Sequence, residues 1–380
     1  QALGDNRGWC SEYVRRAACE ALGAIGDLQA VPALSVWAHA GEDAARNALQ
    51  TLGHPALDLP QAVAQLAAEG AWGILIRALS NEKVRKAVVR LGAPAVPALI
   101  QALRDWDENV RRAAAEALGA IGDLQAVPAL TQALGDSEWW VRRAAAEALG
   151  AIGDPQAVPV LIQALGDRDS DVRRAAAEAL GKLGTPQAVP ALTKALGDRD
   201  KYVRCAAAGA LGEIGDPHAV PALSVCAHAG EDAARNALQT LGYPALDLPQ
   251  AVAQVAAQGA WSVLIHALPS GKVREAVVKI GTSAVPALIQ ALGDRDKYVR
   301  CAAAGALGKL GDPQAAPALI QALGDNDWWV RRAAAVALGA IGDPKAVPAL
   351  TGRLRDESAD VRKAARDAIQ QIQAKQSGKG

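Results

Sequence analysis

The sequence predicts an all-α solenoid, a right-handed superhelix in which two-helix repeats stack on one another. Three observations predict it: a 31-residue period, a helical spacing of apolar residues within each period, and Gly or Pro at the helix ends. A Val-Arg dipeptide recurs every 31 residues in two trains. Its valines are Val110, Val141, Val172 and Val203 in the first train, and Val299, Val330 and Val361 in the second. A period of this length is typical of a repeat array.

Residues 137–167, SEWWVRRAAAEALGAIGDPQAVPVLIQALGD, represent the unit. Val141, Ala145, Leu149 and Ile152 form an apolar stripe at helical spacing, and Gly153 is placed to end that helix. An Asp-Pro pair follows and starts a second helix over roughly 155–165. Neither helix can cover its apolar side alone, so we expect neighbouring units to stack.

The pattern VRRAAAEALGxIGDxxAVPxLIxAL stands almost unaltered at four places. These are 141–165, 172–196, 203–223 and 330–350. It resembles the HEAT-like repeats named after phycobilisome lyases. The resemblance implies a HEAT-like solenoid over nearly the whole chain, and it indicates function only weakly.

A longer period of 189 residues relates Val110 to Val299 and Val141 to Val330. It predicts one solenoid made of two blocks, 1–189 and 190–380, each with about six repeats. Each block contains one irregular segment, at 54–81 and at 243–270, where we expect a displaced or extra helix that bends the array. Such a bend is either a docking ledge or drift fixed before the duplication, and we favour drift.

The stretch AHAGEDAARNALQTLG occurs identically at 38–53 and 227–242, just before each irregular segment. Arg46 lies in register with the repeated Val-Arg arginine, so we interpret the stretch as a degenerate repeat rather than a catalytic cluster. Glu42 and Asp43 are expected in the first helical turn, where negative charge suits the helix dipole. His39 and His228 then mark equivalent places at the two bends.

Composition narrows the class of protein. The 40 Lys and Arg balance the 40 Asp and Glu, which disfavours a nucleic-acid partner, because such proteins usually carry a basic stripe. No apolar run is long enough to span a membrane. Five cysteines without a CxxC pair suit a reducing, cytoplasmic setting. The chain has no Met and opens on QALGD, the end of a repeat's second helix, so we expect a fragment of a larger protein.

Comparison of the units identifies a variable stripe on the first helix, which in the HEAT-like family faces the concave surface. The two positions before Val, the position two after Val and the position six after Val vary most. Seven of the thirteen Trp and Tyr residues occupy the pair before Val, although the chain has no Phe. Trp and Tyr with Arg are enriched at binding hot spots, although rings that pack on the next unit would give the same pattern. The predicted partner-binding residues are Tyr13, Trp139, Trp140, Arg143, Glu147, Tyr202, Tyr298, Trp328, Trp329 and Arg332. Arg143 and Arg332 lie one turn from Trp140 and Trp329, a spacing suited to cation–π contacts.

The Val-Arg arginines recur in every regular unit, which indicates a structural role. They are Arg111, Arg142, Arg173, Arg204, Arg300 and Arg331. The family resemblance implies that they bond loop groups such as the Asp after Ile-Gly. Those aspartates are Asp123, Asp154, Asp216, Asp312 and Asp343.

No zinc pattern, phosphate loop or nucleophile motif is present, so we expect no metal, no cofactor and no catalysis. Cys205 and Cys301 lie on the variable stripe, and we interpret them as small apolar filler. The predicted function is a non-enzymatic scaffold that binds a protein or peptide on its concave face, as a region of a longer scaffold or sensor. A bilin-lyase-like chromophore handler and a nucleic-acid binder are the alternatives.

Overall fold

The structure is a computed structural model that describes residues 10–377. These residues form 25 α-helices, interspersed with short 3-10 turns, and no strand. The predicted all-α solenoid of stacked two-helix repeats is confirmed. The chain divides into two compact units, Gln1–Leu183 and Gly184–Gly380, and each is described by itself. The predicted half-repeat at QALGD lies outside the described residues.

A regular repeat follows the predicted pattern closely. Helix α10 (Trp139–Ile152) ends at Gly153, whose φ of 80° is the left-handed conformation expected after a helix. The Asp154 carboxylate then accepts a hydrogen bond from the Gln156 backbone N–H at 2.9 Å. This bond starts a 3-10 turn (Pro155–Ala157) that leads into α11 (Val158–Ala164). The second helix of the repeat therefore begins as a 3-10 turn and continues as an α-helix.

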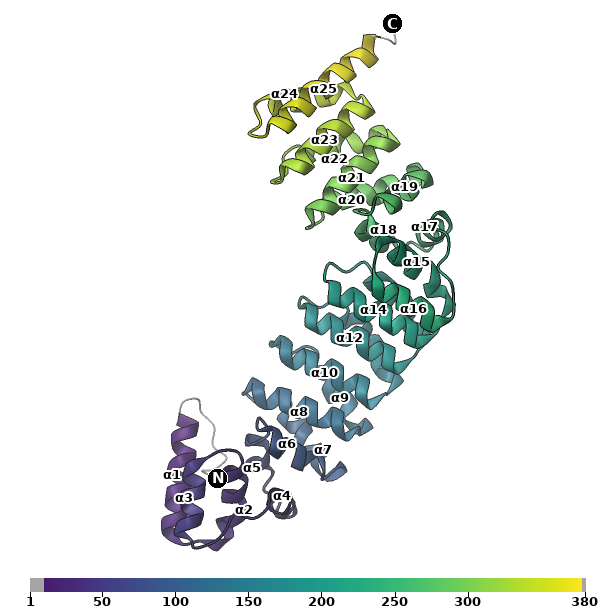
Figure 1. Cartoon of the computed structure of the whole chain (residues 1–380). Coiled ribbons are helices and arrows are strands. Elements are labelled where there is room, and N and C mark those ends of the chain that lie inside the picture. The colour runs from purple at the N-terminus through teal and green to yellow at the C-terminus, as the bar shows by residue number, and fades with distance from the viewer. Residues whose placement is uncertain (1–9, 378–380) are drawn as a thin grey trace. The chain divides into compact units, whose positions relative to one another are not determined.

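In the first unit, the first helices of the regular repeats pack directly against one another (Figure 1). They are α8 (Glu108–Ile121), α10 and α12 (Ser170–Leu183). The second helices are α7 (Val96–Ala102), α9 (Val127–Ala133) and α11. Valine, alanine and leucine side chains from both helices form the core.

The second unit contains the same kind of repeats. Its regular first helices are α14 (Lys201–Ile214), α21 (Lys297–Leu310), α23 (Trp328–Ile341) and α25 (Ala359–Ser377). The second helices are α13 (Val189–Ala195), α20 (Val285–Ala291), α22 (Ala316–Ala322) and α24 (Val347–Gly352). Helices α21, α23 and α25 form a row in which each packs on the next (Figure 1).

Short helices occupy the irregular segments 54–81 and 243–270. In the first unit the N-terminal helices are α1 (Cys10–Ile25), α2 (Val31–His39), α3 (Asp43–Thr51), α4 (Leu59–Ala68), α5 (Trp72–Arg77) and α6 (Glu82–Val89). Helix α14 is the counterpart of α1 in the second unit, and the counterparts of α2–α6 are α15 (Val220–Ala229), α16 (Asp232–Leu241), α17 (Leu248–Ala257), α18 (Trp261–Ala267) and α19 (Gly271–Ile280). Asp58 caps α4 through the Gln61 N–H, and Gly70, with φ 71°, separates α4 from α5.

The duplicated histidines fasten the irregular segments to the preceding helix. His39 Nε2 donates to the Leu57 carbonyl oxygen at 2.9 Å, while the Leu57 N–H donates to Ser35 Oγ at 3.0 Å. His228 makes the same contact with the carbonyl of Leu246, also at 2.9 Å. These histidines therefore have a local structural task in both copies.

Adjacent first helices approach closely because the Gly of Ala-Leu-Gly faces an Ala of the next helix. A Cβ placed on Gly308 would lie 2.8 Å from Cα of Ala337, which no real Cβ tolerates without a shift. The same close approach occurs in the first unit, where Gly119 faces Ala148. The recurrence of Gly at this position is therefore a packing requirement of the stack.

We expect Gly308→Ala to destabilise the protein by about 1–3 kcal/mol, because the new methyl group overpacks the contact with Ala337. Gly305→Ala in the same helix is the matched control, since a Cβ there meets nothing within 4 Å. The control should be neutral or stabilising by about 0.5–1 kcal/mol, because alanine favours the helix. Urea unfolding followed by circular dichroism measures both, and equal effects at the two positions would refute the close packing.

Candidate binding surface

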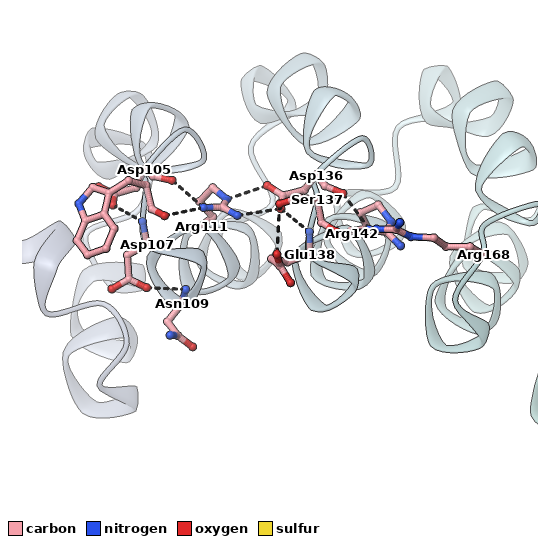
Figure 2. Close-up of polar contacts among 10 residues, drawn as sticks. Asp105, Asp107, Asn109, Arg111, Asp136, Ser137, Glu138, Arg142 and Arg168 are labelled. Atoms are coloured by element: carbon pink, nitrogen blue, oxygen red, sulfur yellow. Dashed lines mark hydrogen bonds and ion pairs between the residues drawn. The ribbon is translucent and has the colours of Figure 1, made fainter. Parts of the chain in front are cut away.

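The arginines of the Val-Arg dipeptides link successive loops of the stack. We call Arg111, Arg142, Arg204, Arg300 and Arg331 the inter-loop arginines. Figure 2 shows Arg111 between the loop at Asp105 and the loop at Asp136, with Arg142 continuing from the second loop. Each such side chain bonds the loop before its own helix and the loop that closes its repeat.

The geometry around Arg142 is representative. Its Nε and Nη2 donate to the two carboxylate oxygens of Asp167 at 2.8 and 2.9 Å. Its Nη1 donates to the carbonyl oxygens of Asp136 and Ser137 at 2.9 and 3.0 Å. The arginine side chain is 5% exposed and the aspartate side chain 14% exposed. Paired, charge-assisted bonds of this kind combine strength with fixed orientation.

The pairing partner is a residue that the sequence did not identify. Bidentate pairs join Arg111 to Asp136, Arg142 to Asp167, Arg300 to Asp325 and Arg331 to Asp356. Arg204 instead contacts Glu231 at 2.9 Å. Glu231 belongs to the duplicated stretch, where it replaces the usual Leu-Gly-Asp aspartate. Arg173 donates to the Asp167 carbonyl oxygen at 2.9 Å, as the other arginines do to theirs.

The prediction that the Val-Arg arginines bond the Asp after Ile-Gly is therefore wrong. Those aspartates, Asp123, Asp154, Asp216, Asp312 and Asp343, each accept a hydrogen bond from the backbone N–H two residues later. They lie at the opposite end of the first helix from the arginine and cap the 3-10 turn there. Their role is structural but local.

The aromatic residues before Val lie at the start of the first helices. Tyr13 and Tyr202 are 72% and 70% exposed. Trp139 and Trp140 are half-buried and meet edge to face, with ring centroids 5.5 Å apart. The other predicted aromatics come together in the second unit. These are Tyr298, Trp328 and Trp329, which are 52%, 39% and 43% exposed.

Two aromatic contacts join α21 to α23. Tyr298 and Trp329 meet edge to face with centroids 6.1 Å apart. The cation over this pair is Lys297, at 5.6 Å from the Tyr298 centroid and 5.9 Å from the Trp329 centroid. The cation observed over Trp329 is thus Lys297, while the sequence spacing had pointed to Arg332. In the first unit Arg143 forms an ion pair with Glu147 at 2.7 Å, which draws its guanidinium along the helix.

A groove of about 620 Å³ lies along α19, α21 and α23, at the predicted variable stripe. Tyr298, Cys301 and Gly305 line it from α21. Trp329, Arg332 and Val336 line it from α23, and Arg274 lines it from α19. Its walls are mainly apolar, and no Asp or Glu lines it. Three predicted residues, Tyr298, Trp329 and Arg332, thus meet at one site, while Tyr13, Tyr202 and the Trp139–Trp140 pair lie elsewhere.

Sequence reasoning missed Arg274, Gly305 and Val336 as members of the site. The signal was present in the 189-residue period. Position 305 corresponds to Glu116 and position 336 to Glu147, so both groove positions lost a carboxylate relative to the other block. Cys301 was recognised as a variable-stripe residue and interpreted as filler.

Two cysteine thiols of the second unit have raised pKa values. Burial is the main cause that raises the pKa of Cys301, and it raises the pKa of Cys226 to about 12. A thiol with a raised pKa stays protonated at neutral pH and is a weak nucleophile.

Within residues 10–377 no group of three or more His, Cys, Asp and Glu side chains is placed to hold a metal ion. Across the same residues, no helix combines the length and apolar character needed to cross a membrane.

Comparison with known proteins identifies the class. The family model of HEAT repeats matches residues 96–175, 158–242 and 285–370, which is more than half of the chain. The model of the PBS lyase HEAT-like repeat matches residues 14–35. The chain therefore belongs to the HEAT-repeat family. No curated protein matches it in sequence.

Several solved structures are similar over long stretches. Human deoxyhypusine hydroxylase is 23% identical, with 76% of this chain and 98% of that chain covered and a TM-score of 0.29. The complex of CpcE and CpcF of phycocyanin lyase from a Nostoc species is 27% identical, covering 73% and 94%, with a TM-score of 0.27. Kap121p is 15% identical, covering 98% and 48%, with a TM-score of 0.41. The fold assignment rests on the helices of this chain and on the family match.

We expect Arg142→Ala to cost about 3 kcal/mol, because it leaves the Asp167 carboxylate and two loop carbonyls without their donor. Arg143→Ala is the matched control in the same helix, since its ion pair with Glu147 is about 40% exposed on both sides. An exposed pair of this kind contributes about 0.5 kcal/mol or less. Urea unfolding compares the two variants, and similar losses would show that the inter-loop link does not hold the stack.

The same links predict a loss of stability in acid. The hydrogen bonds from Arg331 are the main cause that lowers the pKa of the Asp356 carboxyl. Burial alone would raise the pKa of Asp136, but hydrogen bonds from Arg111 and the Glu138 backbone outweigh it and lower the pKa. A carboxyl whose folded pKa is lowered stabilises the fold above its ordinary value of about 4, and this contribution is lost as pH falls through the folded pKa.

The midpoint of thermal unfolding should therefore stay nearly constant from neutral pH to about pH 5 and fall below about pH 4. Asp356→Asn cannot titrate at this site, so it should start from a lower midpoint and lose less on acidification. Melting curves recorded by circular dichroism across this range provide the test. An identical acid response in both proteins would contradict the assignment.

Proposed function

We propose that this HEAT-repeat chain is a non-enzymatic binding module that recognises a protein or peptide through the variable face of its first helices. The observation that carries the proposal is the exposed aromatic group at the start of α21 and α23. Tyr298, Trp328 and Trp329 leave 52%, 39% and 43% of their surface in solvent, next to a groove of about 620 Å³. Half-exposed Trp and Tyr beside a concave apolar surface are the residue types that dominate binding energy in protein interfaces.

If the Trp and Tyr rings served only to pack the interior, large rings should be common in the core. The core of both units is made mainly of Ala, Val and Leu, and the chain contains no Phe. Trp37 is the one Trp or Tyr side chain in the core of the described residues, so large rings contribute little to the interior of this protein. Their placement at the helix starts, beside the ordered inter-loop arginines, gives them a rigid support, which lowers the entropy cost of binding.

We also assign the protein to the cytoplasm, where its free thiols Cys19, Cys205, Cys226 and Cys301 suit a reducing environment.

The test compares capture of proteins from a lysate of the producing cells by three folded forms. The combined variant Trp139→Ala, Trp140→Ala, Trp328→Ala and Trp329→Ala should lose the partners that the unmodified protein captures. The control is Leu28→Ala with Leu124→Ala, because these side chains are 61% and 60% exposed but lie in 3-10 turns away from the helix starts. The control should retain the partners, and a folded tryptophan variant that captures the same set would sink the proposal.

A further inference from the structure

The two blocks differ in the carboxylates that accompany the arginines of the variable stripe. In the first block Glu116 receives Arg85 at 3.2 Å and Arg112 at 3.4 Å. Glu147 likewise receives Arg143 at 2.7 Å. These carboxylates lie on the variable stripe of α8 and α10 and neutralise the neighbouring guanidinium groups. The stripe of the first block is therefore covered by ion pairs.

In the second block the carboxylates are absent and two of the arginines remain. The positions 189 residues later hold Gly305 in place of Glu116 and Val336 in place of Glu147. Arg274 and Arg332 correspond to Arg85 and Arg143. Among the described residues neither of these two arginines is paired with a carboxylate: Arg274 donates only to the Leu268 carbonyl oxygen, at 3.4 Å. The second block thus presents two cations without their counter-charge.

The two positions at which Gly305 and Val336 stand in place of glutamate form part of the apolar surface of the groove. Gly305 has no side chain, and a Cβ there would meet nothing within 4 Å. Val336 is 53% exposed and Cys301 replaces Arg112, so the groove floor is apolar. Lys309 adds a further positive charge at the wall. Lys297 lies at the aromatic rim, but Asp327 already neutralises it at 3.1 Å.

We propose that this groove binds an acidic peptide segment of a partner protein, with an apolar side chain seated over Gly305 and carboxylates on Arg332 and Arg274. This inference rests on the proposed function and specifies the chemistry of its partner. The ligand restores the carboxylates that Glu116 and Glu147 supply in the first block. An apolar side chain fills the space left by the Glu-to-Gly change, and Tyr298 and Trp329 flank it. Charge complementarity selects acidic segments over neutral or basic ones.

The chain itself supplies the blocking variant. Cys301→Arg, Gly305→Glu and Val336→Glu together install the residues of the first block, a combination that already folds on the same repeat. A second variant, Lys309→Gln with Arg332→Gln, removes positive charge and leaves the apolar groove intact. A phage-displayed library of random dodecapeptides is selected on the unmodified full chain. The enriched peptides are then synthesised, and their binding to all three proteins is measured by fluorescence anisotropy.

Enriched peptides should combine Asp or Glu with Leu, Ile, Val or an aromatic residue. Their Kd should rise at least about tenfold in both variants, which corresponds to the loss of a charge-assisted contact or of the groove itself. Peptides that are basic or neutral, or that bind the blocking variant unchanged, would overturn the inference. If peptides that overturn the inference lose binding when Trp139 and Trp140 are changed to Ala, the proposed binding function stands and only the acidic-peptide inference fails. If no peptide is enriched on the chain, both proposals fail.

Discussion

The stack depends on one interaction, the pairing of each inter-loop arginine with a carboxylate about one repeat further along. Arg111 holds the loop before its own helix by two carbonyl oxygens and the loop after its repeat by both oxygens of Asp136. Asp136 in turn offers its carbonyl oxygen to Arg142, so this loop is held from both sides. Because the guanidinium fork is planar and its bonds are directional, this chain of contacts fixes the spacing and the orientation of successive repeats.

The second constraint is the close approach of Gly to Ala between first helices. Gly150 faces Ala179 as closely as Gly308 faces Ala337, so at this separation of the helices neither position has room for a Cβ. Together, the two constraints use one side and one end of each first helix. The variable stripe lies outside these two constraints, so its residues are freer to diverge. This freedom explains why two duplicated blocks share their arginines and glycines but differ at Glu116 and Gly305.

Much of the architecture was predictable because it is local. The apolar stripe of the first helix, the left-handed glycine at 153 and the cap at Asp154 follow from residues within a few positions of one another, and the 31-residue period repeats them along the chain. The partner of Arg142 was not predictable in this way, since Asp167 lies 25 residues away and competes with the nearer Asp154. The helix geometry decides between them: Asp154 is at the far end of the helix, and Asp167 returns to the arginine after the second helix.

The candidate site shows the same division between local pattern and spatial arrangement. The variable stripe and its aromatics were visible in the sequence, and two predicted aromatics, Tyr298 and Trp329, line the groove together with the predicted Arg332. The edge-to-face contact of Tyr298 with Trp329 and the position of Lys297 above them depend on side-chain packing between helices, which no spacing rule supplies. The open space over Gly305 also required the structure, because a glycine in a helix can equally mark a close contact, as Gly308 does.

A double-mutant cycle on Arg300 and Asp325 measures directly whether the pairing of an inter-loop arginine with its carboxylate holds successive repeats together. Their side chains are 15% and 12% exposed and joined by two hydrogen bonds of 2.7 and 2.9 Å. The free energy of unfolding would be measured for Arg300→Ala, Asp325→Ala and the double variant. We expect the double variant to lose little more stability than either single variant, with a coupling of about 2–3 kcal/mol. Losses that simply add, with a coupling near zero, would contradict the view that this pairing holds the repeats together.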